Sequence, residues 1–392
     1  MRHVLAVALL LAGCRSDHHD DRHDDRQPSA QVASPVPKLS LSPDGIAELK
    51  AIDRRIEIHK DDPKTVLAYL GQRASARGRL EDYQSMLAIS ADWVGKAPDD
   101  SDAWVARAHV LATVHDFGGA RAALGHVKGS AGDDEAIALD EATGHRDRSL
   151  PAREAVARTR HDATTLTQYI ASLALAGRFD EARAAIPKAA ALVRDNPPVL
   201  FAWFYFQWGR VYEQAGDLAT ARAFYEASHA RMPNIEVTAH LVAAELATND
   251  PAAAKRLVAE TLATDRHPSI VELGVSLGLT SVADAKAAWE RYVAALPLAF
   301  ADHAARFYVT VDPPRALALA QTNLANRDTP EARALVVLAA LAADDPAAAC
   351  AVVDPLLEAP QRADRFTAWR AVSRCGRGSD AARLARDLGI GP

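Results

Sequence analysis

Apolar residues recur with helical spacing along most of this chain, and short breaks divide them into segments. From about residue 43 to residue 392, amphipathic stretches alternate with tight breaks at Gly, Asn-Asp or Asp-Pro. Strand-forming residues are scattered, and no sustained alternation of apolar and polar positions is bounded by turn residues. The pattern therefore predicts an all-α protein built from many short helices.

The clearest segment runs from residue 201 to residue 234, where two predicted helices flank a break at Gly216-Asp217. Small residues at Gly209 and Ala221 let two helix backbones approach closely, while aromatic side chains fill the space beside them. This segment resembles a tetratricopeptide repeat (TPR). The residues that match the repeat pattern are Trp208, Gly209, Tyr212, Gly216, Asp217, Ala221, Tyr225 and Pro233.

The same arrangement recurs at a nearly constant period. Alanines at the expected helix crossing follow Ala221 at intervals of 33, 31, 31, 33 and 32 residues, each a few residues after a turn signal. Upstream, the segments around Gly177, Phe117 and Gly78 repeat it less perfectly, and Tyr83 occupies a position where a small residue is expected. The later crossing alanines are Ala254, Ala285, Ala316, Ala349 and Ala381.

A period of this length indicates a solenoid of about nine or ten stacked helix pairs covering residues 43–392, with the best-defined repeats at 163–235. The register is weakest between about residues 128 and 162, which we interpret as one divergent unit with a lengthened turn. The alternative is an irregular alanine-rich bundle. The fold class that we predict is all-α, a TPR-like superhelix with a concave inner surface.

The resemblance implies binding of proteins or peptides along the concave face, which the first helix of each pair mainly lines. At the matching positions of the best unit lie Trp203, Phe206, Arg210 and Glu213. Nine of the 23 aromatic residues fall between Phe201 and Tyr225, and Trp beside Arg is a common binding anchor. The alternative is that these side chains pack against neighbouring units.

The charge pattern narrows the choice of partner. The net charge is -6, with 45 basic and 51 acidic residues interspersed along the chain. A nucleic-acid-binding protein would concentrate basic residues on one face, so nucleic acid is not expected as a partner. Such a mixed surface mainly keeps the chain soluble.

The N-terminus has the layout of a bacterial secretion signal. Arg2 is followed by an apolar run that is too short to span a bilayer, and the segment ends at Cys14. The sequence Leu11-Ala12-Gly13-Cys14 resembles the lipobox of bacterial lipoproteins. That resemblance implies a signal peptide at residues 1–13, lipidation of Cys14 and membrane attachment through the acyl chains. Arg15 rather than aspartate follows the cysteine, which favours the periplasmic face of the outer membrane.

Residues 14–42 are polar and then rich in Pro, Ser and Ala, which is typical of a disordered tether. His18, His19 and His23 alternate there with aspartates, and such side chains can ligate zinc, copper or nickel. A flexible spacer presets no ligand geometry, so we expect no metal site of defined stoichiometry and no cofactor.

Two further cysteines, Cys350 and Cys375, fall in consecutive predicted helix pairs at a similar level. A disulfide between them is geometrically feasible in an oxidising compartment, and two buried free thiols are the alternative.

The sequence contains no phosphate-binding glycine loop, no paired-histidine zinc helix and no nucleophile-elbow serine, so we do not expect an enzyme. Two functional classes remain. The first is an envelope scaffold or adaptor that binds protein or peptide partners. The second is a carrier or sensor lipoprotein that binds a small ligand or metal.

Overall fold

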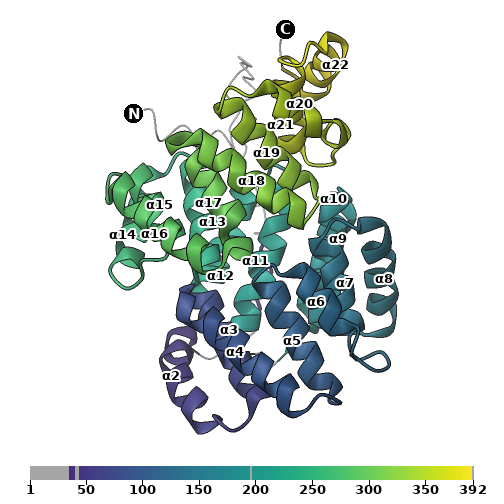
Figure 1. The fold of residues 1–392 in the computed structure, drawn as a ribbon, viewed down its shortest axis with the longest axis vertical. Helices are drawn as coiled ribbons and strands as arrows, with labels where there is room; N and C mark the ends of the chain where they lie inside the picture. The colour runs from purple at the N-terminus through teal and green to yellow at the C-terminus, as the bar shows by residue number, and fades with distance from the viewer. Residues whose placement is uncertain (1–34, 40–43, 195–196, 391–392) are drawn as a thin grey trace, which may run out of the picture.

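The computed structural model describes residues 35–39, 44–194 and 197–390. These residues form 21 α-helices, one short 3₁₀-helix and no strand, which confirms the predicted all-α class (Figure 1). Among them, no helix is both long enough and apolar enough to span a lipid bilayer. The signal segment, Cys14 and the histidines of the tether lie outside the described residues.

A lone helix, α2 (Gly45–Ile58), precedes ten consecutive helix pairs, which agrees with the nine or ten expected from the period. In chain order, the pairs are α3 (Pro63–Arg77) with α4 (Leu80–Lys96), α5 (Ser101–Thr113) with α6 (Phe117–Leu124), α7 (Asp133–Ala142) with α8 (Arg146–Thr159), α9 (Ala163–Leu175) with α10 (Phe179–Leu192), α11 (Pro198–Gln214) with α12 (Leu218–Arg231), α13 (Ile235–Ala247) with α14 (Pro251–Leu262), α15 (Pro268–Ser276) with α16 (Val282–Ala295), α17 (Pro297–Val311) with α18 (Pro313–Asn326), α19 (Pro330–Ala342) with α20 (Pro346–Val352), and α21 (Arg362–Val372) with α22 (Gly378–Leu388). The 3₁₀-helix η1 (Asp354–Leu356) follows α20.

Local sequence explains why each pair folds back on itself. In nine of the ten pairs, the turn between the two helices contains a residue with a left-handed backbone, usually glycine. The exception is the α17–α18 turn, where Asp312 caps the second helix and Pro313 opens it. Aspartate caps of this kind recur at α6, α12, α14 and α20, where a carboxylate accepts from a backbone N–H of the first turn.

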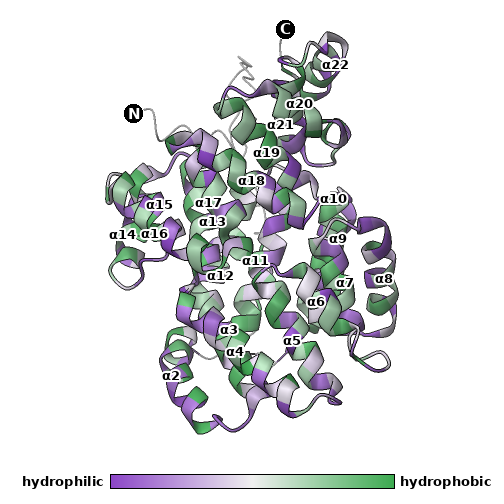
Figure 2. Cartoon of the chain, in the orientation of Figure 1, coloured by the Kyte–Doolittle hydropathy of each residue, from purple (hydrophilic) through white to green (hydrophobic). Residues whose placement is uncertain are grey.

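Small residues allow the two helices of a pair to cross closely. Ala221, Ala254 and Ala285 are completely buried at their crossings, as are the matching alanines of later pairs except Ala381, which is half-buried. A Cβ at Gly209 would lie 2.7 Å from the Tyr225 ring, so α11 and α12 pack too closely for any larger residue there. Figure 2 shows the apolar residues along the contacts between helices.

The region of weakest register forms one helix pair, α7–α8, as expected, but the predicted lengthening of its turn is wrong. Gly144 makes an ordinary tight turn between α7 and α8, with φ of 87°. The extra residues lie instead in the connection from α6 to α7, before the pair begins. The first helix, α7, begins directly after Gly132, and its first turn is acidic, which suits the positive end of the helix dipole.

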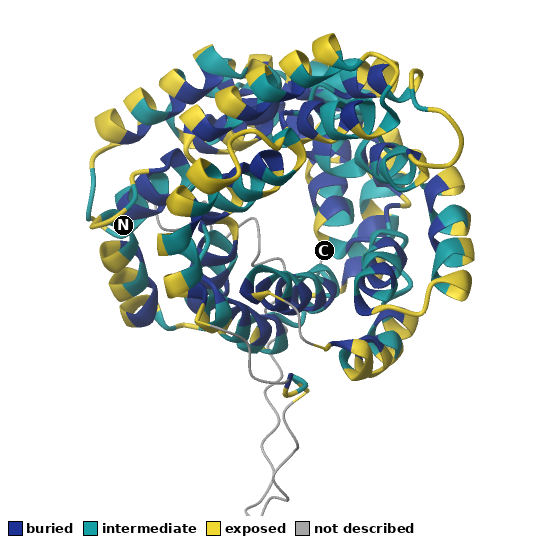
Figure 3. Cartoon of the chain, turned by 90° about the horizontal axis from the view of Figure 1, so that it is seen from below, coloured by how far each residue is buried: buried dark blue, intermediate teal, exposed yellow. Residues whose placement is uncertain are grey.

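The superhelix closes on itself, so that helix pairs six apart in the chain are in direct contact. Viewed along its length, the ribbon forms a ring (Figure 3). Tyr292 at the end of α16 donates a hydrogen bond to the Gly78 carbonyl (3.0 Å), and Asn326 of α18 donates one to the His115 carbonyl (2.8 Å). The turn of an early pair therefore meets the end of the second helix of the pair that lies six pairs later.

Two more contacts of this kind follow along the same seam. Arg146 at the start of α8 binds Glu331 on α19 at 2.9 Å, and Gln361 donates to the Leu175 carbonyl at 3.1 Å. A Cβ at Gly144 would lie 2.3 Å from the Asp328 carbonyl oxygen, and one at Gly177 would lie 2.4 Å from Pro360. These two glycines therefore supply both a left-handed turn and room for the facing loop.

Tyr83, the departure from the repeat pattern, also belongs to this seam. Its ring packs edge-on against Phe300 of α17, with 6.0 Å between ring centroids. Burial raises the pKa of its hydroxyl to about 12. The large side chain therefore fills space between distant pairs, which accounts for its presence where a small residue was expected.

Cys350 and Cys375 are joined by a disulfide, with 5.8 Å between their Cα atoms. Cys350 lies near the end of α20, and Cys375 lies in the turn that follows α21. The bond therefore links the last two helix pairs, and of the two alternatives left open by the sequence, the structure has the disulfide rather than free thiols.

Candidate partner-binding face

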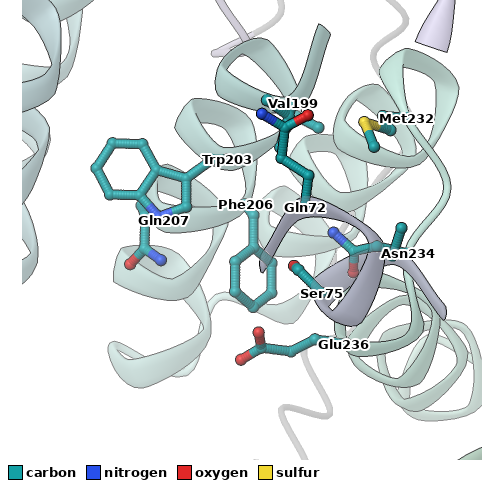
Figure 4. A pocket seen from close by; sticks show the side chains of 11 residues that line it. Gln72, Ser75, Val199, Trp203, Phe206, Gln207, Met232, Asn234 and Glu236 are labelled. Atoms are coloured by element: carbon teal, nitrogen blue, oxygen red, sulfur yellow. The ribbon is translucent and has the colours of Figure 1, made fainter. Parts of the chain in front are cut away.

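Four residues of α11 lie along one side of the helix, at the positions that the repeat resemblance assigns to the concave face. That side borders a cavity of about 130 Å³ between α11, α3 and the start of α13 (Figure 4). Pockets for drug-sized ligands measure about 300–1,000 Å³, so this cavity fits one or two side chains rather than a whole cofactor. Its lining residues are Gln72, Ser75, Ala76, Val199, Ala202, Trp203, Phe206, Gln207, Met232, Asn234 and Glu236.

Trp203 offers the largest apolar surface at this cavity. Its side chain is half-buried and packs against Phe204, with 5.5 Å between ring centroids. The indole N–H makes no hydrogen bond to any residue that the structure describes. An aromatic anchor with an unused donor at the edge of a small cavity has the character of a binding hot spot.

Phe206 lies deeper and packs between repeats. It is 4% exposed, and its ring contacts those of Tyr225 and His240 at centroid distances of 5.7 and 5.3 Å. It lines the cavity but offers little surface to a partner, so its main role is to support the site. For this residue the structure favours the packing alternative that the sequence left open.

Arg210 remains partly accessible beside the cavity. Its side chain is 34% exposed and lies over the Phe206 ring, with 5.9 Å from the guanidinium carbon to the ring centroid. Its nearest carboxylates are Glu213 at 3.7 Å and Glu236 at 3.9 Å. Its guanidinium donates no hydrogen bond to a residue that the structure describes, and although Nε is buried, the terminal nitrogens can still donate to a ligand.

Glu213 is already engaged inside the protein. Its carboxylate accepts hydrogen bonds from Tyr225 (2.6 Å) and His240 (3.0 Å), and its side chain is 13% exposed. Burial alone raises the pKa of Glu213, but the charges of His240 and Arg210 and these hydrogen bonds outweigh burial and lower it to about 2. Glu213 therefore holds Arg210 and His240 in place and is not a free acceptor.

Charged residues on several first helices converge on the same interior. The charge of Glu331 on α19 favours higher pKa values for Arg210 on α11 and for Asp364 on α21. The charge of Arg306 on α17 has the opposite effect and favours lower pKa values for Asp364 and for Glu272 of α15. The inner surface is thus polar and mixed in charge around the apolar Trp203.

Two acids of this interior are desolvated. Burial raises the pKa of Glu272 to about 7, although a hydrogen bond from Trp289 favours its ionised form. Burial and the nearby charge of Glu331 raise the pKa of Asp364 to about 7, and its Oδ2 has no hydrogen-bond partner. Both groups change charge near neutral pH, whereas Glu213 does not.

Residues from α3 at this site were not predicted. Gln72 and Ser75 line the cavity together with Trp203 and Phe206, although more than a hundred residues separate them from α11 in the chain (Figure 4). No local pattern identifies them, because only the closure of the ring brings the first pair beside the fifth. The residues that the structure describes hold no cluster of three or more His, Cys, Asp or Glu side chains placed to bind a metal.

No protein-family model and no curated protein sequence matches the chain. Solved structures with a similar arrangement of helices include the Cut9–Hcn1 hetero-tetramer of the APC/C, with a TM-score of 0.47 and 12% identity, covering 85% of this chain and 66% of that one. Naa15/Naa10 bound to HypK-THB has a TM-score of 0.31 and 12% identity, covering 87% of this chain and 60% of that one.

The TPR2AB domain of yeast Sti1 in complex with an HSP90 peptide has a TM-score of 0.24 and 17% identity, covering 74% of this chain and 97% of that one. This chain spans less than two thirds of the length of the first two neighbours. The helix pairs, buried crossing alanines and left-handed turns of the structure itself make this chain a TPR-like helical-repeat solenoid.

Proposed function

We propose that this chain is a lipid-anchored scaffold or adaptor of a bacterial cell envelope, which holds a protein or peptide partner against the inner face of its TPR-like superhelix. The observation that carries the binding role is Trp203, which is half-buried with an unused indole N–H beside the partly accessible Arg210. Both lie on the face that members of this repeat class use for peptides. The role is binding rather than catalysis.

The charge around the site suggests the chemistry of the partner segment. Arg210 has donor capacity to spare, while Glu236 is 60% exposed and lies 3.9 Å from it. A segment with one apolar side chain for the cavity, flanked by polar or charged residues of both signs, complements this surface. The small cavity favours such a segment over the runner-up, a small-ligand carrier, because it is below the size of an ordinary ligand pocket.

The anchor rests on the N-terminal motif, because Leu11-Ala12-Gly13-Cys14 has the order and spacing of a lipobox. In this proposal Cys14 carries the acyl chains, and Arg15 directs the protein to the periplasmic face of the outer membrane. Metabolic labelling with an alkyne-bearing palmitate, followed by membrane fractionation, tests it. Label and membrane association should both disappear in Cys14→Ser, and equal labelling of that variant would remove the anchor from the proposal.

The binding role is tested by affinity capture from crosslinked cells with quantitative mass spectrometry. Truncating a hot-spot residue typically costs about 2 kcal/mol or more, so Trp203→Ala and Arg210→Ala should each weaken capture of a specific partner at least about tenfold. Arg222→Ala is the control for loss of a partly buried arginine, because Arg222 pairs with Glu226 and with Asp250 of the next helix pair and does not border the cavity. Capture that survives both inner-face changes would place the partner elsewhere.

A further inference from the structure

A short stretch of the N-terminal tether is docked on the body of the protein. Residues 35–39, Pro-Val-Pro-Lys-Leu, lie against α11 although more than 160 residues separate them from it in the chain. The Tyr205 hydroxyl donates to the Pro37 carbonyl at 2.9 Å and accepts from the Leu39 N–H at 3.1 Å. One side chain thus clamps the backbone of the segment at two points.

Further contacts hold residues 35–39 in one defined position, called here the seat of the segment. Arg231 at the end of α12 donates to the Leu39 carbonyl at 3.4 Å. Leu39 is 9% exposed and packs with Phe201 and Tyr205, and Val36 also packs against this cluster. Between them, Lys38 points its charge to solvent.

The composition of the segment suits this mode of docking. Each proline fixes its φ near −65°, so less conformational entropy is lost when the segment is held extended. Grooves lined by aromatic residues bind such proline-bearing strands in many recognition domains. The start of α2 also packs closely on the end of α12, because a Cβ at Gly45 would lie only 2.1 Å from the Arg231 carbonyl oxygen.

The docked segment and the candidate partner site use different sides of α11. Residues of an α-helix are about 100° apart, so Tyr205 lies about 200° around the helix from Trp203. None of residues 35–39 lines the cavity beside Trp203. Occupation of one site therefore leaves the other open.

We propose that residues 35–39 form a latch, a cis-docked segment that fixes the point at which the membrane tether leaves the array. The latch rests on the proposed anchor at Cys14 for its role. Pro35 lies 21 positions after Cys14, and a chain extends by at most about 3.6 Å per residue, so the latch lies within roughly 75 Å of the lipid. Without it, the tether would leave the array at the start of α2, where Gly45 lies against the Arg231 carbonyl at the end of α12.

The consequence is a preferred orientation at the membrane. A tether that starts from α11 leaves the array beside the fifth of ten helix pairs, against which the start of α2 also packs. The side of α11 that bears Tyr205 then faces the membrane, and the Trp203 side faces away from it. The inner face is thereby presented to partners in the surrounding compartment.

The latch is tested by amide hydrogen exchange of the purified mature lipoprotein in detergent micelles. The Leu39 amide should exchange at least about tenfold more slowly than an unstructured amide, because its N–H is bonded to Tyr205. Tyr205→Phe removes only the hydroxyl and should abolish this protection. Tyr212→Phe is the matched control, since that hydroxyl on the same helix bonds to no residue that the structure describes.

A second pair of variants tests the apolar part of the seat. Leu39→Asp should release the segment and raise exchange across residues 36–39 to the unstructured rate, whereas Lys38→Asp, one residue away and exposed, should not. Unprotected Leu39 in the unaltered protein would overturn the latch. Protection that falls on dilution would also overturn it, since the docked segment would then come from a second copy.

Reconstitution into phosphatidylethanolamine–phosphatidylglycerol vesicles tests the orientation separately. Spin-labelled lipid headgroups should broaden signals of nitroxides placed on the latch side of α11 and α12 more than those placed beside the cavity, and Leu39→Asp should remove the difference. Equal broadening on both sides in the unaltered protein would contradict the orientation. Failure to bind vesicles would refute the anchor, while protection of Leu39 in detergent would still establish the latch.

Discussion

Gly144 and Gly216 provide a matched pair for testing whether the superhelix closes on itself. Both lie in the turn of a helix pair with nearly identical left-handed backbones, at φ of 87° and 86°. A Cβ at Gly144 would lie 2.3 Å from the Asp328 carbonyl oxygen of a pair far along the chain. A Cβ at Gly216 would meet nothing within 4 Å. Substitution by alanine therefore separates backbone strain from contact between distant pairs.

The expected losses of stability follow from the backbone strain and from the steric contact. A left-handed backbone costs an alanine about 1–2 kcal/mol, and this cost applies equally to both variants. The contact at Gly144 is with a backbone atom, which no side-chain rotation can relieve, and overpacking of this kind costs roughly a further 1–3 kcal/mol. Gly144→Ala should therefore lose about 1–3 kcal/mol more stability than Gly216→Ala.

Repeat arrays need not unfold in one step, so the assay should report locally. Native-state hydrogen exchange in low urea gives the opening free energy of each helix. Gly144→Ala should lower it in α7 and α8 and also in α19, whose Glu331 bonds to Arg146 across the seam. Gly216→Ala should affect only its own neighbourhood. Equal losses in the two variants, or no effect on α19, would refute the closed superhelix.

Two further predictions concern the C-terminal pairs. Reduction of the Cys350–Cys375 disulfide, which closes a loop with a sequence separation of 25, should destabilise α19 to α22 by about 3 kcal/mol from released chain entropy. Calorimetric scans with and without reductant measure this change, and superimposable scans would contradict it. The pKa of Asp364 is raised to about 7 in the folded protein, whereas it is about 4 in the unfolded chain. Its contribution to stability is therefore complete below about pH 4 and is lost as the pH rises from about 4 through 7. Asp364→Asn should therefore gain roughly 2–3 kcal/mol relative to the unaltered protein between pH 5 and pH 8 in urea titrations. A stability difference that is the same at both pH values would show that this carboxyl is not desolvated.

Local features of this fold are predictable from sequence because each depends on residues close together in the chain. The turn at Gly216, the crossing at Ala221 and the close approach at Gly209 follow from the helix–turn–helix pattern of one unit. The period then extends the pattern along the body. It also gives the side of α11 on which Trp203 and Arg210 lie, since helical spacing alone determines which residues share a face.

The closure of the ring is not predictable in this way. It depends on the small rotation between successive pairs, which accumulates over about six of them and leaves no periodic mark in the sequence. Gln72 at the cavity and the Tyr205 seat of the latch both arise from contacts over more than a hundred residues. Tyr83 is the one local anomaly that signalled such a contact, as a large residue at a position meant for a small one.

In the proposed function, binding of a protein partner takes place on the inner face beside Trp203 while the chain is held at the membrane. Its most direct test is site-specific photocrosslinking in intact cells, with benzoylphenylalanine in place of Trp203 or, as a control, of Glu226 on α12, which is half-exposed and does not border the cavity. We predict a discrete adduct with an envelope protein at position 203, none at position 226, and loss of the adduct when Cys14→Ser is combined with the probe. Equal adducts at both positions, or none at position 203, would contradict the account.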